Sequence, residues 1–264
     1  MKKILVTGAG GGMGKAITRR LTDEGHFVYA LDCRDFDAPD NCEKVICDVR
    51  SGDSVREARE KIANSCEELY AIIHTAGIYD LDSLVEMSEE RFKRIFDINL
   101  FGIYRLNKEF LPLLRKGSKI IITSSELAPL DPLPFTGIYA ITKAAVEKYA
   151  YSLRMEMNLL GISVSIIRPG ATKTPLLGDS TSALDKFIEN TENYKTNSQR
   201  FKRIVDSVEA KNVEPDVIGK VASRIIGAKM PRYVYNINRN PLLLILNALP
   251  RRLQNFIIKM ILTK

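Results

Sequence analysis

Runs of apolar residues alternate with amphipathic stretches along the chain as far as about Gly170. Continuous Val- and Ile-rich runs predict strands in "KKILVTG", "HFVYALD", "KVICDV", "LYAIIHTAG", "SKIIITSS" and "ISVSIIRPG". Stretches with helical spacing lie between them, and the longest, "SEERFKRIFDINLFGIYRLNKEFLPLLRKG", predicts a helix that ends near Gly117. Strands that are apolar on both faces and alternate with helices indicate a parallel sheet covered on both sides. The pattern predicts an α/β fold with a doubly wound parallel sheet, in a single domain over residues 1–264.

Ligands of such sheets bind at the carboxyl ends of the strands, so the residues after each predicted strand are the informative ones. The first strand is followed by "TGAGGGMGKA", which leads directly into a predicted helix. The stretch fits T-G-x-x-x-G-x-G, with Gly8, Gly12 and Gly14, because Met13 stands where G-x-G-x-x-G needs its third glycine. Glycines allow a tight turn and a close backbone approach, and a helix N-terminus favours a pyrophosphate. The loop therefore predicts a dinucleotide site.

Two acidic residues follow later strands. A carboxylate at Asp32, where the second strand ends, would accept hydrogen bonds from ribose hydroxyls and repel a 2′-phosphate, which favours NAD over NADP. Arg34 could instead reach a phosphate, so NADP remains possible, and a turn role for Asp32 is the structural alternative. Asp48, in "CDV", could meet the adenine edge or serve as a loop or capping residue.

A tyrosine and a lysine stand four residues apart in "GIYAITKAAVEKYA". On a helix, Tyr139 and Lys143 would share a face. A nearby ammonium group would lower the phenol pKa from its usual value of about 10. The same spacing recurs at Tyr104 and Lys108, so the spacing alone does not separate a catalytic pair from a surface pair.

Six motifs in order give the chain a family resemblance. They are "TGAGGGMG", "HTAG", "FDINLFG" with Asn99, "ITSSE", "YAITK" and "RPGATKT". In these motifs the chain resembles the short, single-domain branch of the short-chain dehydrogenase/reductase family, from Lys3 to about Thr174. The resemblance implies a Rossmann-like sheet and an enzyme that moves a hydride to or from NAD or NADP. A Ser-His-Asp hydrolase is disfavoured, because no G-x-S-x-G elbow is present.

The resemblance assigns roles to individual residues. Tyr139 would be the general acid/base, and Lys143 would lower its pKa and hold the nicotinamide ribose. Ser125 would bind the substrate oxygen, and Asn99 would support a water-linked proton path to Lys143. The implied cofactor-binding residues are Gly8, Gly12, Met13, Gly14, Asp32, Asp48, Val49, Thr75, Ala76, Gly77, Tyr139, Lys143, Pro169, Gly170, Thr172 and Thr174.

Three departures from the family pattern bear on these roles. His74 replaces the usual asparagine, which predicts altered hydrogen bonding beside the cofactor. The spacing from Ser125 to Tyr139 is one residue longer than usual, which a bulge in "APLDPLPF" could absorb, and Ser124 is the alternative serine. Thr172 stands where the family more often has an aliphatic residue, and Thr174 is the better match for the carboxamide contact.

The substrate-loop region, residues 175–215, predicts one or two helices. They would either close over the site with an apolar wall or simply pack as ordinary helices. The apolar side chains in question are Phe187, Ile188, Tyr194, Phe201, Ile204, Val205 and Val208. A wall of this kind would suit a large apolar alcohol or ketone.

The net charge of +7 comes from the C-terminal part of the chain. From Val217 to Lys264 there are nine Lys or Arg and no acidic residue, whereas the rest has 30 basic and 32 acidic residues. No basic nucleic-acid motif is present, so no nucleic-acid partner is predicted. After Pro250 one helical face of the basic tail, residues 229–264, is apolar, through Leu253, Phe256, Ile257, Met260 and Ile261.

Three roles are open for this tail: packing over the substrate cleft, a subunit contact, or a membrane-surface helix. Packing on the protein's own body or a partner subunit is the favoured interpretation. "PRRLQN" interrupts the apolar runs, so a transmembrane span is not predicted. The tail also resembles that of family members that act on steroids and other lipid-like alcohols.

Composition narrows the function further. Four cysteines without zinc spacing and two histidines predict no metal site. The short apolar run after the N-terminal lysines does not fit a signal peptide, which predicts a cytoplasmic protein. The resemblance implies a homodimer or homotetramer. The leading hypothesis is an NAD(P)-dependent oxidoreductase for a secondary alcohol or ketone, such as a hydroxysteroid. The alternatives are a 3-oxoacyl or small carbonyl reductase and a nucleotide-sensing protein without turnover.

Overall fold

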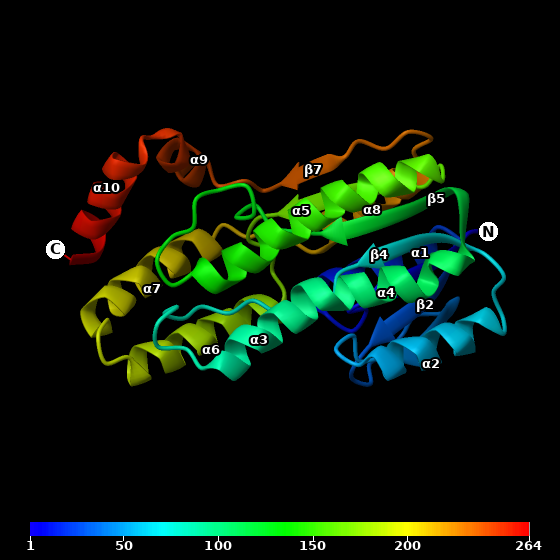
Figure 1. Cartoon of the computed structure of the whole chain (residues 1–264), viewed down its shortest axis with the longest axis horizontal. Coiled ribbons are helices and arrows are strands. Elements are labelled where there is room, and N and C mark those ends of the chain that lie inside the picture. Colours follow the sequence, from blue (N-terminus) through cyan, green and yellow to red (C-terminus); the bar gives the residue numbers. More distant parts are fainter. Residues whose placement is uncertain (264) are drawn as a thin grey trace.

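The computed structural model describes residues 1–263, apart from the side chains of residues 175–181 and of Glu209. Within these residues, seven parallel strands form one sheet in the order β3-β2-β1-β4-β5-β6-β7 (Figure 1). The strands are β1 (Lys3–Thr7), β2 (Phe27–Asp32), β3 (Cys42–Ile46), β4 (Leu69–His74), β5 (Leu114–Thr123), β6 (Ser163–Pro169) and β7 (Val234–Ile237). The prediction of an α/β fold with a doubly wound parallel sheet is confirmed.

Helices connect the strands and extend beyond the last one. They are α1 (Gly12–Asp23), α2 (Gly52–Ala63), α3 (Glu89–Phe96), the π-helical turn η1 (Asp97–Phe101), α4 (Gly102–Phe110), the 3-10 turn η2 (Leu111–Leu113), α5 (Gly137–Leu159), α6 (Pro175–Asn190), α7 (Lys195–Glu209), α8 (Asp216–Gly227), α9 (Pro241–Ala248) and α10 (Arg251–Thr263). Among the described residues, every helix is too short or too polar to span a bilayer.

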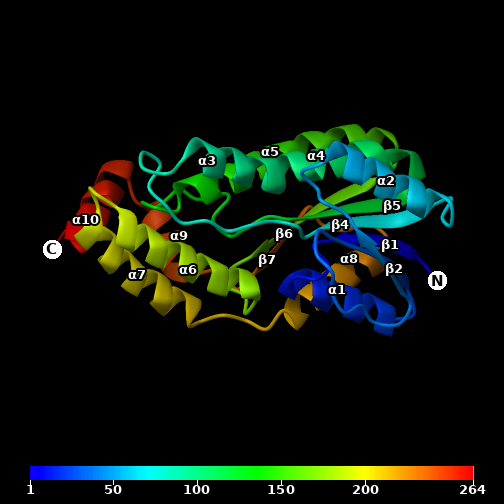
Figure 2. The same ribbon diagram turned by 90° about the horizontal axis from the view of Figure 1, so that it is seen from below.

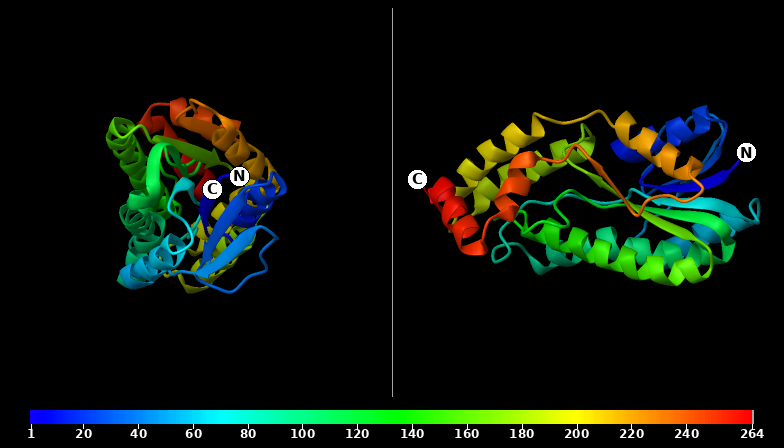
Figure 3. Two further views of the ribbon diagram at one scale, coloured as in Figure 1. Left: turned by 90° about the vertical axis from the view of Figure 1, so that its right-hand side faces the viewer. Right: turned by 90° about the horizontal axis from the view of Figure 1, so that it is seen from above.

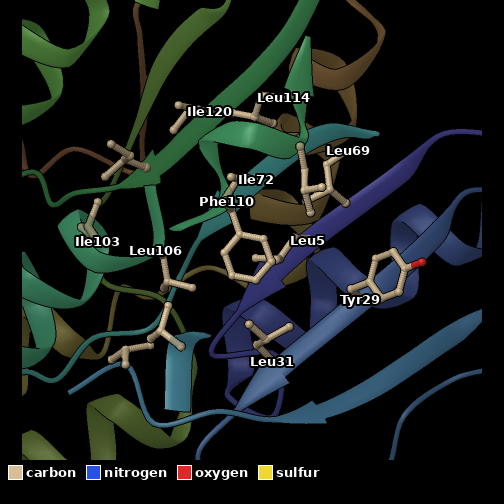
Figure 4. Packing of buried hydrophobic residues seen from close by; sticks show 14 of the residues in the cluster. Leu5, Tyr29, Leu31, Leu69, Ile72, Ile103, Leu106, Phe110, Leu114 and Ile120 are labelled. Carbon is tan, nitrogen blue, oxygen red and sulfur yellow. The ribbon is translucent and has the colours of Figure 1, made fainter. Parts of the chain in front are cut away.

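Each face of the sheet has its own core, because successive side chains of a strand point to opposite faces. Leu5 joins the core covered by α2, α4 and α5, in which Phe110 of α4 lies beside Leu5 and Ile72 (Figure 4). Its neighbours Ile4 and Val6 join the core covered by α1 and α8 on the other face (Figure 2). Burial on both faces explains why these strands are continuous apolar runs in the sequence.

The prediction that the long helix ends near Gly117 is wrong. Helical structure stops at Leu113, and β5 already begins at Leu114. Pro112 lacks a backbone N–H and tightens the chain into the 3-10 turn. Gly117, with φ of 96°, lies within β5 where the pairing of β4 and β5 shifts register.

Helices α6, α7, α9 and α10 lie at the end of the molecule opposite the N-terminus (Figure 3). α6, α7 and α10 share a separate core with Leu81 and Phe135. Phe135 has a left-handed backbone, with φ of 65°, and its ring packs against Phe187, Tyr194 and Phe201. This aromatic packing holds a conformation that non-glycine residues rarely adopt.

Candidate active site

The glycine loop lies against the end of β4. Gly8 has a φ of 65°, and a Cβ on it would stand 2.7 Å from the backbone nitrogen of Ala76. A Cβ on Gly14 would stand 2.1 Å from the carbonyl oxygen of Gly8. At Gly12 the obstructing atom is the methyl carbon of Thr174, at 2.6 Å. The chain can therefore make this tight turn into α1 only with glycine at these positions.

The loop after β4 fixes the position of the glycine loop. The Thr7 hydroxyl oxygen accepts hydrogen bonds from the backbone nitrogens of Thr75 and Ala76, both at 3.2 Å. Gly77 follows, and a Cβ there would stand 3.2 Å from Asn99 Oδ1 and 3.7 Å from Lys143 Nζ. The loop after β4 thus joins the glycine loop to the predicted catalytic groups.

Asp32 ends β2 beside the glycine loop, as the sequence predicts. Its Oδ2 accepts a hydrogen bond from Gly10 N at 3.0 Å, and its Oδ1 accepts one from Arg34 N at 3.2 Å. The Arg34 side chain is exposed, and the carboxylate of Asp32 is partly exposed. These backbone bonds give Asp32 the turn role that the sequence left open, and its contact with ribose hydroxyls remains a prediction.

Asp48 and Val49 are placed differently from each other. The Asp48 carboxylate accepts hydrogen bonds from the backbone and side chain of Arg50, between 2.7 and 3.0 Å, and these bonds hold the pKa of Asp48 below its usual range. The loop role that the sequence left open is therefore present. Val49 is buried, and its side chain packs against Gly102 of α4. A Cβ on Gly102 would stand 2.8 Å from Val49 Cγ2. Contacts of both residues with adenine remain predictions.

Tyr139 and Lys143 lie one turn apart on α5, with both side chains buried. The Lys143 ammonium group is 5.7 Å from the centre of the Tyr139 ring and donates a hydrogen bond to Thr123 O at 3.1 Å. Ser125, two residues after the end of β5, lies close enough to the phenol for its hydroxyl to lower the pKa of Tyr139. Ser124 instead donates to Glu147 Oε1 at 2.9 Å. The structure thus brings Ser125, and not Ser124, to Tyr139.

Burial controls the ionisation of this pair. It raises the pKa of Tyr139 to about 12, and the Ser125 hydroxyl only partly opposes it. It lowers the pKa of Lys143 to about 8, against the attraction of the Glu147 carboxylate. The sequence predicted that Lys143 would lower the phenol pKa, and for this structure that is wrong. The ammonium group bonds to a carbonyl oxygen, and loss of hydration dominates both groups.

These pKa values predict opposite pH profiles for the two directions of reaction. At pH 7 Tyr139 is a neutral phenol and Lys143 is charged, because their pKa values are about 12 and about 8. We expect kcat/KM for reduction to be constant between pH 6 and 7 and to fall above pH 8, where Lys143, to which the family resemblance assigns the nicotinamide ribose, loses its charge. Alcohol oxidation needs a phenolate and should rise with pH. Initial rates in both directions measure this, and oxidation that is fastest near pH 6 would contradict it.

Asn99 lies in the π-helical turn η1, facing the loop after β4. Its Oδ1 accepts from Ile78 N at 2.8 Å, and its Nδ2 donates to Ile78 O at 3.0 Å and to Thr142 Oγ1 at 3.1 Å. The side chain therefore fixes the loop to α5. The water-linked path from Asn99 to Lys143 remains a prediction.

His74, the first departure from the family pattern, points away from the cavity described below. It is fully buried, and its Nε2 bonds to Asn107 Oδ1 of α4 at 2.9 Å. Burial lowers the pKa of His74 to about 4, so the ring is neutral at pH 7. The altered hydrogen bonding predicted at this position therefore joins β4 to α4.

The loop after β6 closes the other side of the site. Pro169 O accepts from Glu126 N at 2.9 Å, and a Cβ on Gly170 would stand 2.1 Å from Asn238 O. The Thr172 hydroxyl donates to Gly170 O at 3.0 Å. Thr174 lies against Gly12 of the glycine loop, and its contact with the carboxamide remains a prediction.

These elements surround one cavity, with Tyr139, Lys143 and Ser125 on its floor. Met13, Thr75, Gly77, Pro169, Gly170, Thr172 and Thr174 also line it. Apolar side chains also line the cavity, namely Ile78, Tyr79, Leu127, Leu133, Phe201, Ile204, Val205, Val208 and Leu243. Of the side chains considered for a substrate lid, those of α7 therefore line the cavity, whereas Phe187, Ile188 and Tyr194 pack with Phe135.

Two acidic residues near the site were not singled out from the sequence. Glu126 directly follows Ser125, is buried and lines the cavity, and its Oε2 accepts from Asn240 N at 2.7 Å. Burial raises its pKa. Glu147, one turn after Lys143, forms a bidentate ion pair with Arg168. Glu126 could have been singled out because it is the one charged residue in the stretch "SSELAPL". The pairing of Glu147 with Arg168 joins residues that are distant in the sequence, so no local pattern predicts it.

Comparison with known proteins agrees with this geometry. Residues 2–185 match the family model described as short chain dehydrogenase. A 3-ketodihydrosphingosine reductase of Bacteroides thetaiotaomicron is 27% identical, over 87% of this chain and 85% of that protein. Estradiol 17-beta-dehydrogenase 2 of Mus musculus is 28% identical, over 98% of this chain and 74% of that protein. An uncharacterized oxidoreductase of Escherichia coli is 34% identical, over 72% of this chain and 73% of that protein.

Solved structures show the same fold. Levodione reductase superimposes with a TM-score of 0.76 at 20% identity, over 90% of this chain and 96% of that chain. Aldohexose dehydrogenase of Thermoplasma acidophilum has a TM-score of 0.74 at 22% identity, over 90% and 92%. The family model covers the strands and helices that build the cavity floor. The chain therefore belongs to the short-chain dehydrogenase/reductase family and is an NAD(P)-dependent oxidoreductase.

Proposed function

We propose that the protein interconverts a secondary alcohol and a ketone on a large apolar molecule, such as a hydroxysteroid, and prefers NAD to NADP. The observation that carries this proposal is the apolar wall that side chains of α7 and α9 give to the cavity that holds Tyr139. Such a wall gains free energy by burying apolar substrate surface, about 25 cal/mol per Å². A small polar carbonyl compound would leave most of it without contacts.

The residues of the glycine loop fit a dinucleotide. Gly8, Gly12 and Gly14 leave no space for a Cβ, so the backbone at the start of α1 can approach a pyrophosphate closely. Asp32 would accept hydrogen bonds from the ribose hydroxyls. Thr174 would contact the carboxamide, and Lys143 the second ribose. A bound nicotinamide supplies or accepts the hydride.

The proton is handled by this chain's own side chains. Tyr139, neutral at pH 7, would donate its phenol proton to the carbonyl oxygen of a ketone, or as phenolate remove a proton from an alcohol. Ser125 would hydrogen-bond the same oxygen and orient it.

Glu126 favours a second candidate substrate, a long-chain amino ketone. Its buried carboxylate lines the cavity directly beside Ser125, where it could pair with an ammonium group close to the carbonyl carbon. The Bacteroides relative is named for such a compound, 3-ketodihydrosphingosine, whereas the mouse relative is named for a steroid, estradiol. A 3-oxoacyl or small carbonyl substrate has no comparable support in the cavity.

A homodimer or homotetramer is part of the proposal. The outer faces of η1, α4 and α5 expose large apolar side chains, and these helices lie side by side (Figure 1). The residues are Phe101, Tyr104, Tyr151, Met155 and Leu159. Exposed apolar patches of this kind mark protein contacts. A cytoplasmic location stays a prediction.

A turnover panel tests the substrate proposal. Hydroxysteroids, a long-chain amino ketone, retinoids, sugars and 3-oxoacyl thioesters would each be assayed with NAD and NADP. We expect the highest kcat/KM with the steroids or the amino ketone. Best turnover of a sugar or a short 3-oxoacyl thioester would overturn the proposal.

Cofactor choice should depend on Asp32. We expect NAD to bind more tightly than NADP, and Asp32→Ala to narrow or reverse that order by removing repulsion of the 2′-phosphate. Fluorescence titration of both nucleotides with wild type and variant measures the two affinities. A clear preference of the wild type for NADP would show that Arg34 outweighs the carboxylate.

A further inference from the structure

The last two helices expose apolar side chains on their outer faces. α10 packs inward through Gln254, Ile258 and Leu262, and in α9 Leu243 and Leu246 turn inward. The outward side chains form what we call the tail surface: Leu242, Ile245, Leu253, Phe256, Met260 and Ile261, between 38% and 68% exposed. The predicted amphipathic helix after Pro250 is therefore present, but most of its predicted apolar face points to solvent.

Unpaired positive charge borders this surface. Arg252 lies four residues before Phe256, and Lys259 lies three residues after it, so both are next to Phe256 on the surface of the helix. Among the described side chains neither has an acidic partner, whereas Arg251 pairs with Asp131 at 3.1 Å. No acidic residue occurs anywhere from Val217 to Lys264. The arrangement is an apolar stripe with basic residues along its edge.

A second copy of this chain is a poor occupant for the tail surface. In a two-fold contact the same patch faces itself, so Arg252 and Lys259 would approach their own copies with no carboxylate of the tail between them. A bilayer that contains anionic lipid meets both requirements, because apolar side chains enter the acyl boundary and basic ones meet phosphates.

We propose that the tail surface docks on an anionic membrane surface, with α9 and α10 lying in the plane of the headgroups. This inference goes beyond the proposed function and does not depend on which alcohol is the substrate. Helices as short as α9 and α10 can lie in a headgroup layer without spanning the bilayer.

Docking in this way would place the cavity beside the lipid. Leu243 lines the cavity, while its neighbour Leu242 and Ile245, two positions on, belong to the tail surface. One turn of α9 therefore separates the membrane from the site. A substrate dissolved in the bilayer could enter without crossing much water.

Vesicle sedimentation of the full chain tests the proposal. The chain should sediment with vesicles of phosphatidylcholine and phosphatidylglycerol and bind pure phosphatidylcholine at least tenfold less. It should lose most binding in high salt, because salt screens the attraction between the basic residues and the anionic headgroups. The double variant Ile245→Glu with Phe256→Glu should lower the partition constant about tenfold or more. Arg252→Glu with Lys259→Glu should do the same at low salt.

Met230→Glu is the matched control, because Met230 is 90% exposed and lies outside the tail surface. It should bind vesicles like the wild type. Turnover of a water-soluble substrate without vesicles should be unchanged in all three variants, since these residues do not line the cavity. Sedimentation of the wild type with neither vesicle overturns the proposal. So does a tail variant that dissociates an oligomer while vesicle binding stays intact, which would make the tail a subunit contact.

Discussion

Replacing Tyr139 with phenylalanine should reduce kcat by about 1,000-fold while nucleotide affinity stays within a few-fold of the wild type. The substitution removes only the phenol oxygen, the group that faces Ser125 and would transfer the proton. The ring itself should keep its packing, including the edge contact with Tyr79 at 4.4 Å between centroids. Steady-state rates with the best substrate, together with a nucleotide titration, measure the two effects separately.

Tyr104→Phe is the matched control. Tyr104 also precedes a lysine by four residues, but it lies on α4 and is 46% exposed. Its variant should keep the wild-type kcat, because no part of Tyr104 lines the cavity. Substantial turnover in Tyr139→Phe, or a comparable loss in Tyr104→Phe, would refute the assignment of the proton donor.

Replacing Gly14 with alanine should abolish measurable nucleotide binding, with a loss in affinity of about 100-fold or more. The new Cβ would stand 2.1 Å from Gly8 O and 2.7 Å from Thr75 Oγ1, so backbone must move. The displaced loop would no longer approach a pyrophosphate. Titration calorimetry measures the affinity, and thermal unfolding shows whether the variant still folds.

Gly227→Ala provides the comparison for that variant. Gly227 ends α8 and has nothing within 4 Å of an added Cβ. Its replacement should leave nucleotide affinity unchanged, because the position is open and remote from the loop. If Gly14→Ala bound nucleotide as tightly as Gly227→Ala does, the glycine loop would not be the pyrophosphate site.

The elements that the sequence predicts well are those whose environment is uniform. β1 is buried on both faces, so its apolar run and the glycine loop after it are unambiguous. The i, i+4 spacing placed Tyr139 and Lys143 together, and the motif order separated this pair from Tyr104 and Lys108. In each case a short stretch of chain contains the whole signal.

What the sequence did not predict depends on contacts between distant residues. β7 has few fully buried residues and forms by pairing with β6. The early start of β5 follows from its pairing with β4. The inward face of α10 includes Gln254, which an apolar pattern assigns to solvent, yet its amide donates to Leu249 O at 2.8 Å. The ionisation of Tyr139 likewise follows from burial, which spacing cannot give.

The packing of α1 against α8 bears on how the chain reaches its fold during synthesis. Ile17 and Leu21, made early, share a core with Ile218 and Ile225, which are separated from them by about 200 residues of chain. Until α8 has left the ribosome, the part of this apolar face that α8 covers stays open to water. Contacts between such distant segments form slowly and leave partly folded chains prone to aggregation. Translation stalled before Asp216 should therefore yield an insoluble or chaperone-bound nascent chain, although every residue of the catalytic floor has already been made.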